Sequence, residues 1–192
     1  MELVDPDVRF HRSFLSAVEE FVADGEPRYA GLPVFGWGGV PGDEFPRQAI
    51  QDPAGFAALV RVVVEAKRPF AARPAGYVPW TELWMADGDE YLGRITLRHE
   101  LTDALLTWGG HIGYAVRPSA RRRGHASTAL AGMLEVAWRR GIDPVLVTCD
   151  VDNLGSRRVI ERAGGAFEDV REGKRRYWVP SREPSAAPVH GG

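Results

Sequence analysis

Apolar positions in the first third of the chain recur at helical spacing in two segments. The first segment ends at Gly25, and its apolar stripe consists of Phe14, Leu15, Val18, Phe21 and Val22. The second has a clear start, because Asp52 can cap a helix and Pro53 suits its first position. Its stripe consists of Phe56, Leu59, Val60, Val63 and Val64. The Gly- and Pro-rich residues 28–50 between them predict an ordered loop that packs aromatic side chains.

From residue 81 the pattern becomes typical of strands. Residues 81–86 and 91–97 flank the turn signal Asp87-Gly88-Asp89, which predicts a hairpin. Residues 111–116 predict another strand, while residues 100–108 fit neither pattern. The apolar positions of residues 126–138 then share one helical face, and Gly141 supplies the stop.

The remaining elements complete an α/β pattern. Residues 145–149 predict a strand, so the succession strand, loop, helix, strand indicates a right-handed crossover. Asn153 can cap a short helix, and residues 175–179 predict a final strand. We therefore expect one domain, with N-terminal helices and an aromatic-rich loop in residues 1–76, a core in residues 77–180, and a frayed tail in residues 181–192.

Composition narrows the function classes. Hydrophobic residues make up 44% of the 192 residues, which is enough for a core. The formal net charge is −2, which argues against general attraction to nucleic acid or to anionic lipid. The single cysteine, Cys149, excludes an intrachain disulfide and a two-cysteine zinc site, and no metal is expected. With no apolar signal core and no bilayer-length apolar run, the sequence predicts a cytoplasmic protein without a membrane partner.

One motif carries specific chemistry, at the junction between the strand 111–116 and the long helix. A helix start presents unpaired N–H groups and partial positive charge, so it suits an anion. Gly124 allows a phosphate to approach the backbone, and three arginines add positive potential. The alternative is that these arginines begin a solvated helix. The expected pyrophosphate-binding residues are Arg121, Arg122, Arg123, Gly124, His125, Ala126 and Ser127.

Residues 109–167 resemble the GCN5-related N-acetyltransferase (GNAT) superfamily. The matching blocks occur in order and with matching spacing. They are Gly113-Tyr114-Ala115-Val116-Arg117-Pro118, residues 121–126, the amphipathic helix, the strand 145–149, Asn153-Leu154-Gly155-Ser156 and Glu161-Arg162-Ala163-Gly164-Gly165.

The resemblance implies a mixed, splayed sheet and acetyl-CoA as the co-substrate. Pantetheine would lie beside Ala115 and Val116, in the gap between the strands 111–116 and 145–149, much as an added strand would. Asn153 would bind the pantetheine arm, and Ser156 would lie near the thioester sulfur. The implied reaction is direct attack on acetyl-CoA by an amine of a small molecule or peptide, in a monomer or homodimer.

The sequence departs from the family pattern at Ile160, where many members carry a tyrosine that protonates the leaving thiolate. An aliphatic residue there, with Asn-x-x-Ser before it, resembles the branch that includes ribosomal-protein N-terminal acetyltransferases. Ser156 is then the leading candidate for the acid. A non-catalytic acyl-CoA-binding or sensing module is the alternative function.

The leading candidates for the base that takes a proton from the amine are His111 and Glu82. His99 and Glu100 follow the strand 91–97 in an expected surface turn, from which either could also reach the amine. His111 has a near-neutral reference pKa, and its alternative role is a histidine hydrogen-bonded within the sheet. Glu82 lies on the first strand of the hairpin, and its alternative is a solvent-facing strand position. The tryptophans of the acceptor half indicate either core packing or an aromatic wall for the acceptor, and they are Trp37, Trp80, Trp84 and Trp108.

Overall fold

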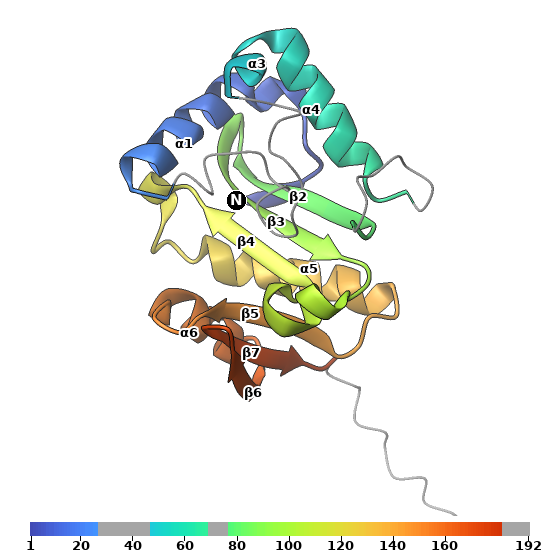
Figure 1. Ribbon diagram of the computed structural model, residues 1–192. Coiled ribbons are helices and arrows are strands. Elements are labelled where there is room, and N and C mark those ends of the chain that lie inside the picture. The colour runs from blue at the N-terminus through green and yellow to red at the C-terminus, as the bar shows by residue number, and fades with distance from the viewer. Residues whose placement is uncertain (27–46, 69–76, 182–192) are drawn as a thin grey trace, which may run out of the picture.

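The computed structural model describes residues 1–26, 47–68 and 77–181. Its strands are β1 (Glu2–Val4), β2 (Trp80–Asp87), β3 (Glu90–Arg98), β4 (Ile112–Val116), β5 (Val145–Asp150), β6 (Ala166–Arg171) and β7 (Lys174–Val179). Its helices are α1 (His11–Ala23), α3 (Arg47–Gln51), α4 (Pro53–Glu65), α5 (His125–Arg139) and α6 (Leu154–Arg162). The strands form one mixed sheet in the order β1-β2-β3-β4-β5-β7-β6, with helices against it (Figure 1). The α/β fold predicted from the sequence is confirmed.

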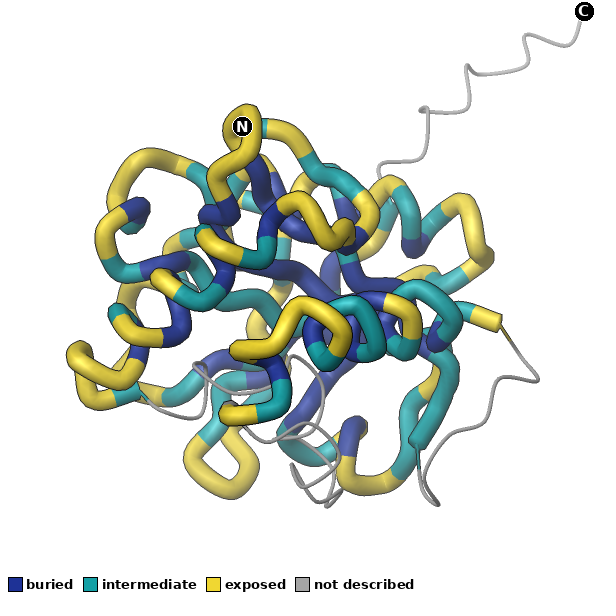
Figure 2. Tube along the Cα trace, turned by 90° about the horizontal axis from the view of Figure 1, so that it is seen from above, coloured by how far each residue is buried: buried dark blue, intermediate teal, exposed yellow. Residues whose placement is uncertain are grey.

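Two apolar layers hold the helices to the sheet. Residues of α1 and α4 pack with β2 and β3 in one layer, and α5 packs with the strands and α6 in the other. Figure 1 shows α1, α3 and α4 together at one end of the molecule and α6, β6 and β7 at the other. In Figure 2 the buried segments run through the centre of the molecule, while exposed segments form its periphery.

An aromatic cluster fixes α1 and α4 against the sheet. Trp84 is fully buried at its centre, with ring centroids 5.3 Å from Phe14, 5.2 Å from Tyr91 and 6.1 Å from Phe56. Such contacts add to the burial energy of each ring. Trp84 is therefore a core residue, which was one of the two roles predicted for the tryptophans. Trp80 is buried in the same layer, whereas Trp37 lies outside the described residues.

The start of α4 forms as predicted. The Asp52 side chain accepts hydrogen bonds from the N–H groups of Ala54 at 2.9 Å and Gly55 at 3.1 Å. Helix α3 reaches so close to this turn that a Cβ on Gly55 would lie 1.9 Å from the Ala49 carbonyl oxygen. The prediction of a loop through residue 50 was thus wrong for residues 47–50, which belong to α3.

Two strands escaped the sequence analysis. β1 has only three residues, which is too short for a periodic signal, and pairs with β2. β6 is an edge strand on which most residues are exposed, so it lacks an apolar alternation. The ambiguous residues 100–108 overlap with a π-helical turn, Leu105–Gly109, that leads into β4.

The central strands β4 and β5 part after a single pairing. They run parallel, and their only registered partners in the described chain are Ile112 and Val147. One further bond, from the His111 N–H to the Leu146 carbonyl at 2.7 Å, closes the near end. On its β5 side, β4 therefore has no strand partner over residues 113–116, and the splay expected from the sequence is present.

Candidate active site

A pocket opens where β4 and β5 part. The residues around it come from β3, the turn before β4, β4, β5, the start of α6 and the first residue of β7. They are Arg94, Thr96, Arg98, Gly109, Ile112, Gly113, Tyr114, Ala115, Thr148, Cys149, Asp150, Asn153, Ser156 and Lys174. The sequence prediction placed Ala115, Asn153 and Ser156 at this site, and the fold brings these three together. Val116 continues β4 beyond the pocket, towards the loop that precedes α5.

The loop between β4 and α5 has the backbone geometry of an anion site. Gly124 is the residue before α5 and has φ +86°, a left-handed conformation that favours glycine. A Cβ added there would meet nothing within 4 Å, so the space above it is open. Within the described chain, the N–H groups of residues 122–126 have no backbone acceptor, whereas those of Ser127 and Thr128 bond to the Gly124 carbonyl. Five adjacent donors at a helix start fit a pyrophosphate.

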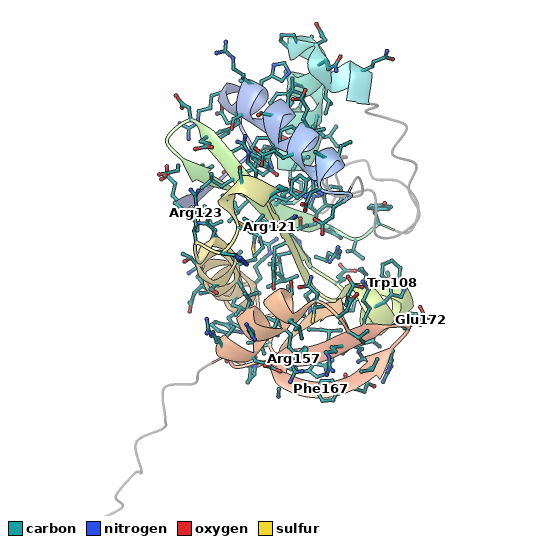
Figure 3. All side chains as sticks on the ribbon, turned by 90° about the vertical axis from the view of Figure 1, so that its left-hand side faces the viewer. Trp108, Arg121, Arg123, Arg157, Phe167 and Glu172 are labelled. Atoms are coloured by element: carbon teal, nitrogen blue, oxygen red, sulfur yellow. The ribbon has the colours of Figure 1, made fainter. Side chains whose placement is uncertain are left out.

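The three arginines of this loop do not behave alike. Arg121 forms ion pairs with Asp24 at 2.7 Å and Glu26 at 2.5 Å, and its Nε donates to the Val116 carbonyl at 3.2 Å. Its charge is thus already balanced by two carboxylates that follow the end of α1. Arg122 and Arg123 are exposed and are better placed to add positive potential. Figure 3 shows Arg121 and Arg123 near each other, with Trp108 well away across the molecule.

Helix α1 also holds the other end of the loop. The Arg117 guanidinium is buried and donates to Glu20 at 2.7 Å, and the Ser119 N–H donates to the same carboxylate at 3.0 Å. These charge-assisted bonds fix the exit from β4 against α1. The loop therefore starts from a rigid anchor, which preorganises its free N–H groups.

The start of α6 brings Asn153 and Ser156 to the pocket. The Asn153 side chain caps the helix by accepting a bond from the Ser156 N–H at 2.9 Å. The Tyr114 hydroxyl donates to the Ser156 carbonyl at 3.5 Å, which ties α6 to β4 across the gap. Ile160, one turn later, is fully buried in the core with Tyr177 and does not line the pocket.

Glu82 is buried beside the pocket rather than facing solvent. Its carboxylate accepts bonds from Trp84 Nε1 at 2.9 Å and from the Thr96 hydroxyl at 3.2 Å. Burial raises the pKa of Glu82, although the Arg94 charge opposes the shift. The solvent-facing alternative for this position was wrong. Thr96 itself lines the pocket, so Glu82 is one hydrogen bond away from it.

His111 is hydrogen-bonded within the sheet. It is buried, and its Nδ1 accepts a bond from the Leu146 N–H at 2.9 Å. Burial, together with the charge of Arg98, lowers the pKa of His111 to about 4. His111 is not among the residues that line the pocket, although Ile112 beside it is. The contact is the one expected for the structural alternative, and a role in proton transfer stays a prediction.

The sequence analysis missed the contribution of β3. Arg94, Thr96 and Arg98 alternate with the buried Ile95 and Leu97, so all three project to the pocket face of the sheet. Polar side chains on one face of a central strand were the signal that could have revealed them, because such positions are normally apolar. Cys149 also lines the pocket, and burial raises the pKa of its thiol.

Residues 48–166, more than half of the chain, match the family described as the acetyltransferase (GNAT) domain. The chain belongs to the GNAT acetyltransferase family. The match includes β2 to α6 and therefore contains the loop, the parting strands and all the pocket residues except Lys174. Acetyl-CoA, expected from the sequence as co-substrate, is the acetyl donor that this family assignment supports. No curated protein sequence gave a significant match.

Solved structures of several acetyltransferases share the fold. The microcin self-immunity acetyltransferase MccE, solved with acetyl-CoA and AMP, has a TM-score of 0.58 and 11% identity over 93% of this chain and 91% of its own. RimL, a ribosomal alpha-N-protein acetyltransferase solved with coenzyme A, has a TM-score of 0.55 and 16% identity over 92% of this chain and 90% of its own. Mycobacterium smegmatis RimJ has a TM-score of 0.57 and 17% identity over 92% of this chain and 81% of its own. At these identities the likeness concerns the fold.

Within residues 1–26, 47–68 and 77–181 there is no group of three or more His, Cys, Asp or Glu side chains that could hold a metal ion. Among the helices of the same residues, none is long and apolar enough to cross a membrane.

Proposed function

We propose that this GNAT member transfers the acetyl group of acetyl-CoA to an amine of a small molecule or peptide by direct attack. The observation that carries the proposal is the unpaired side of β4, which has the free N–H groups of residues 122–126 beyond its end and the pocket lined by Ser156 beside it. Pyrophosphate would bind at the loop, and pantetheine would add to the open edge of β4 at Ala115 and Val116. The thioester would then lie in the pocket.

The acceptor amine must lose a proton to attack the thioester carbonyl carbon. We assign the base role to Glu82, acting through the hydroxyl of Thr96, which lines the pocket and donates to the Glu82 carboxylate. A raised carboxyl pKa makes Glu82 a stronger base than an ordinary glutamate. His111 is the second candidate, but its lowered pKa makes it a weak base.

Attack forms the C–N bond, and collapse of the tetrahedral intermediate breaks the C–S bond and releases the CoA thiolate. We assign the stabilisation of that thiolate to the Ser156 hydroxyl, on the first turn of α6. A hydroxyl is a weak acid, so a hydrogen bond to sulfur with a proton from water is the expected role. Direct attack is favoured over an acetyl-cysteine, because burial raises the pKa of the Cys149 thiol and so disfavours its nucleophilic form.

The test is an acceptor screen that follows CoA thiol release with amino acids, peptides, polyamines and aminoglycosides. Direct attack predicts intersecting initial-velocity lines when acetyl-CoA and acceptor are varied together, whereas parallel lines would indicate an acetyl-enzyme. The second candidate function, an acyl-CoA sensor, is favoured by the buried Ile160 in place of a tyrosine. It predicts calorimetric binding of acetyl-CoA with no turnover of any acceptor.

A further inference from the structure

Three cationic side chains line the pocket, and they differ in their partners. Lys174 is ion-paired with Asp150 across the β5–β7 pair. Arg94 lies close enough to the Glu82 carboxylate to lower its pKa against the effect of burial. Among the described residues, Arg98 has no carboxylate within ion-pair distance; its Nη1 donates instead to the Gly109 and Gly110 carbonyl oxygens, at 3.2 Å each.

Arg98 is held over the closed end of the gap between β4 and β5. A Cβ on Gly113 would lie 3.6 Å from its Nη2 and 3.7 Å from its Nη1, so the guanidinium lies against the backbone of β4. The two carbonyl bonds fix Nη1 to the turn before β4. Nη2 has no acceptor among residues 1–26, 47–68 and 77–181, and the side chain lines the pocket.

A cation in this setting is costly unless an anion accompanies it. Burial of a guanidinium is compensated when a carboxylate or phosphate pairs with it, and carbonyl dipoles compensate only in part. The charge of Arg98 has two effects on pKa values. Burial lowers the pKa of Arg98 itself to about 10, and the charge of Arg98 contributes to the lowered pKa of His111. Acetyl-CoA does not supply the anion, because its phosphates would bind at residues 122–126, beyond the other end of β4.

We infer that Arg98 binds an anionic group of the acceptor, so that the substrates are amines that also carry a carboxylate or a phosphate. Planar donors on a guanidinium match either group and orient it. With its anion at Arg98 and its amine near Thr96, two residues along β3 on the same face, such an acceptor would span a few atoms between the two groups. The inference rests on the proposed acetyltransferase function and names its substrate class.

The experiment compares matched acceptors that differ only in the anion. Amino acids are paired with their amides, and O-phosphoethanolamine with ethanolamine, at saturating acetyl-CoA. The wild-type protein is expected to show at least tenfold higher kcat/KM for the anionic member of a pair. Preference in the first pair alone identifies a carboxylate, and preference in the second alone a phosphate. This preference would oppose intrinsic reactivity in the amino-acid pairs, since the amine of an amide carries less positive charge at neutral pH.

Variants separate binding of the acceptor anion from other roles. Arg98→Gln should bring the ratio of kcat/KM for the anionic acceptor to that for its matched partner close to one. Arg98→Lys should keep part of this preference, because it retains the charge but not the planar donors. Arg139→Gln, which removes an exposed arginine at the end of α5, should leave the ratio unchanged. Melting temperature checks folding, and the Lys variant reports on the charge if the Gln variant unfolds.

The outcomes distinguish this inference from the proposed function. If the wild-type protein acetylates amines that lack an anionic group as well as amines that carry one, the inference is overturned and the proposed acetyltransferase function is unaffected. An equal loss with both members of a pair in Arg98→Gln also overturns it, because that result indicates that Arg98 stabilises the oxyanion or the fold. Absence of turnover with every acceptor contradicts the proposed function itself.

Discussion

The indole N–H of Trp84 donates a 2.9 Å hydrogen bond to the carboxylate of Glu82, two residues earlier on the same face of β2. Trp84 is at the centre of the aromatic cluster of α1, α4 and β3, so the cluster also positions a group beside the pocket. The second oxygen of Glu82 accepts a bond from the Thr96 hydroxyl of β3. The core on one side of the sheet thereby holds a buried carboxylate at a fixed distance from the pocket.

Replacing Glu82 by Gln should lower kcat by about 100-fold or more, which is the range typical of a lost general base. In the wild-type protein the rate should increase with pH as Glu82 ionises. Because burial raises the pKa of Glu82, this increase should occur at a higher pH than the ionisation of an ordinary glutamate. The Gln variant should lack that limb of the pH–rate profile. Steady-state rates between pH 4.5 and 9 would test both statements.

Thr96→Val is the matched test of the link between Glu82 and the pocket. It keeps the shape of the side chain but removes the hydroxyl that donates to Glu82. If the proton passes through Thr96, the double variant Glu82→Gln/Thr96→Val should be no slower than Glu82→Gln alone. Both changes then interrupt the same proton-transfer path. Losses that multiply would show that the proton does not pass through Thr96. A Glu82→Gln variant with an unchanged pH–rate profile would assign the base elsewhere, with His111 next to be tested.

Gly124→Glu should abolish measurable binding of acetyl-CoA. It introduces negative charge and bulk into the open space beside the free N–H groups of residues 122–126, and it places a non-glycine residue at φ +86°. Gly88→Glu is the matched control, because Gly88 also has positive φ with open space around it but lies in the β2–β3 turn. Calorimetry should show loss of binding in the first variant only. Normal binding by a folded Gly124→Glu variant would mean that the loop is misassigned.

The sequence was informative where a local signal determines the structure. Asp52 and Asn153 cap the helices predicted for them, and Gly124 lies at a turn that requires a left-handed residue. These features depend on neighbours within a few positions. The two helix starts and the glycine turn before α5 could therefore be predicted from the sequence, whereas anion binding at that turn stays a prediction.

The acceptor side depends on contacts between distant segments, and the sequence alone did not provide them. Glu82 is buried because Trp84 and Thr96 bond to it, and Thr96 comes from another strand, 14 residues away. Arg121 was expected to attract phosphate, but Asp24 and Glu26, nearly a hundred residues earlier, balance its charge. Pairings of this kind follow from the sheet order and the packing of α1, which periodicity does not encode.

His111 should make the stability of the protein depend on acid pH. Its pKa is lowered to about 4 in the folded protein, whereas an unfolded histidine titrates near 6.5. The unfolded state therefore binds more protons between these values. The contribution of His111 is fully present above about pH 6.5 and is lost as the pH falls through 4, by an amount on the order of 3 kcal/mol.

The measurement is the free energy of unfolding by urea between pH 4 and 7.5. His111→Gln should flatten this dependence relative to the wild-type protein, because glutamine does not titrate. A neutral side chain that can still accept from the Leu146 N–H retains the sheet contact. An equal slope in the two proteins would show that other groups cause the acid sensitivity.

Ser156→Ala should lower kcat while the affinity for acetyl-CoA changes little. Ser156 lines the pocket on the first turn of α6, and the helix cap uses the Ser156 N–H with the Asn153 side chain, so alanine preserves the cap. A hydrogen bond to the leaving sulfur strengthens as negative charge develops there, so its loss affects the transition state more than the bound substrate. Asn153→Ala is the contrasting variant, since it removes the cap and the expected pantetheine contact together. It should weaken acetyl-CoA binding as well as stability. Single-turnover rates and calorimetry on both variants separate the two roles, and an unchanged kcat in folded Ser156→Ala would leave water as the proton source for the thiolate.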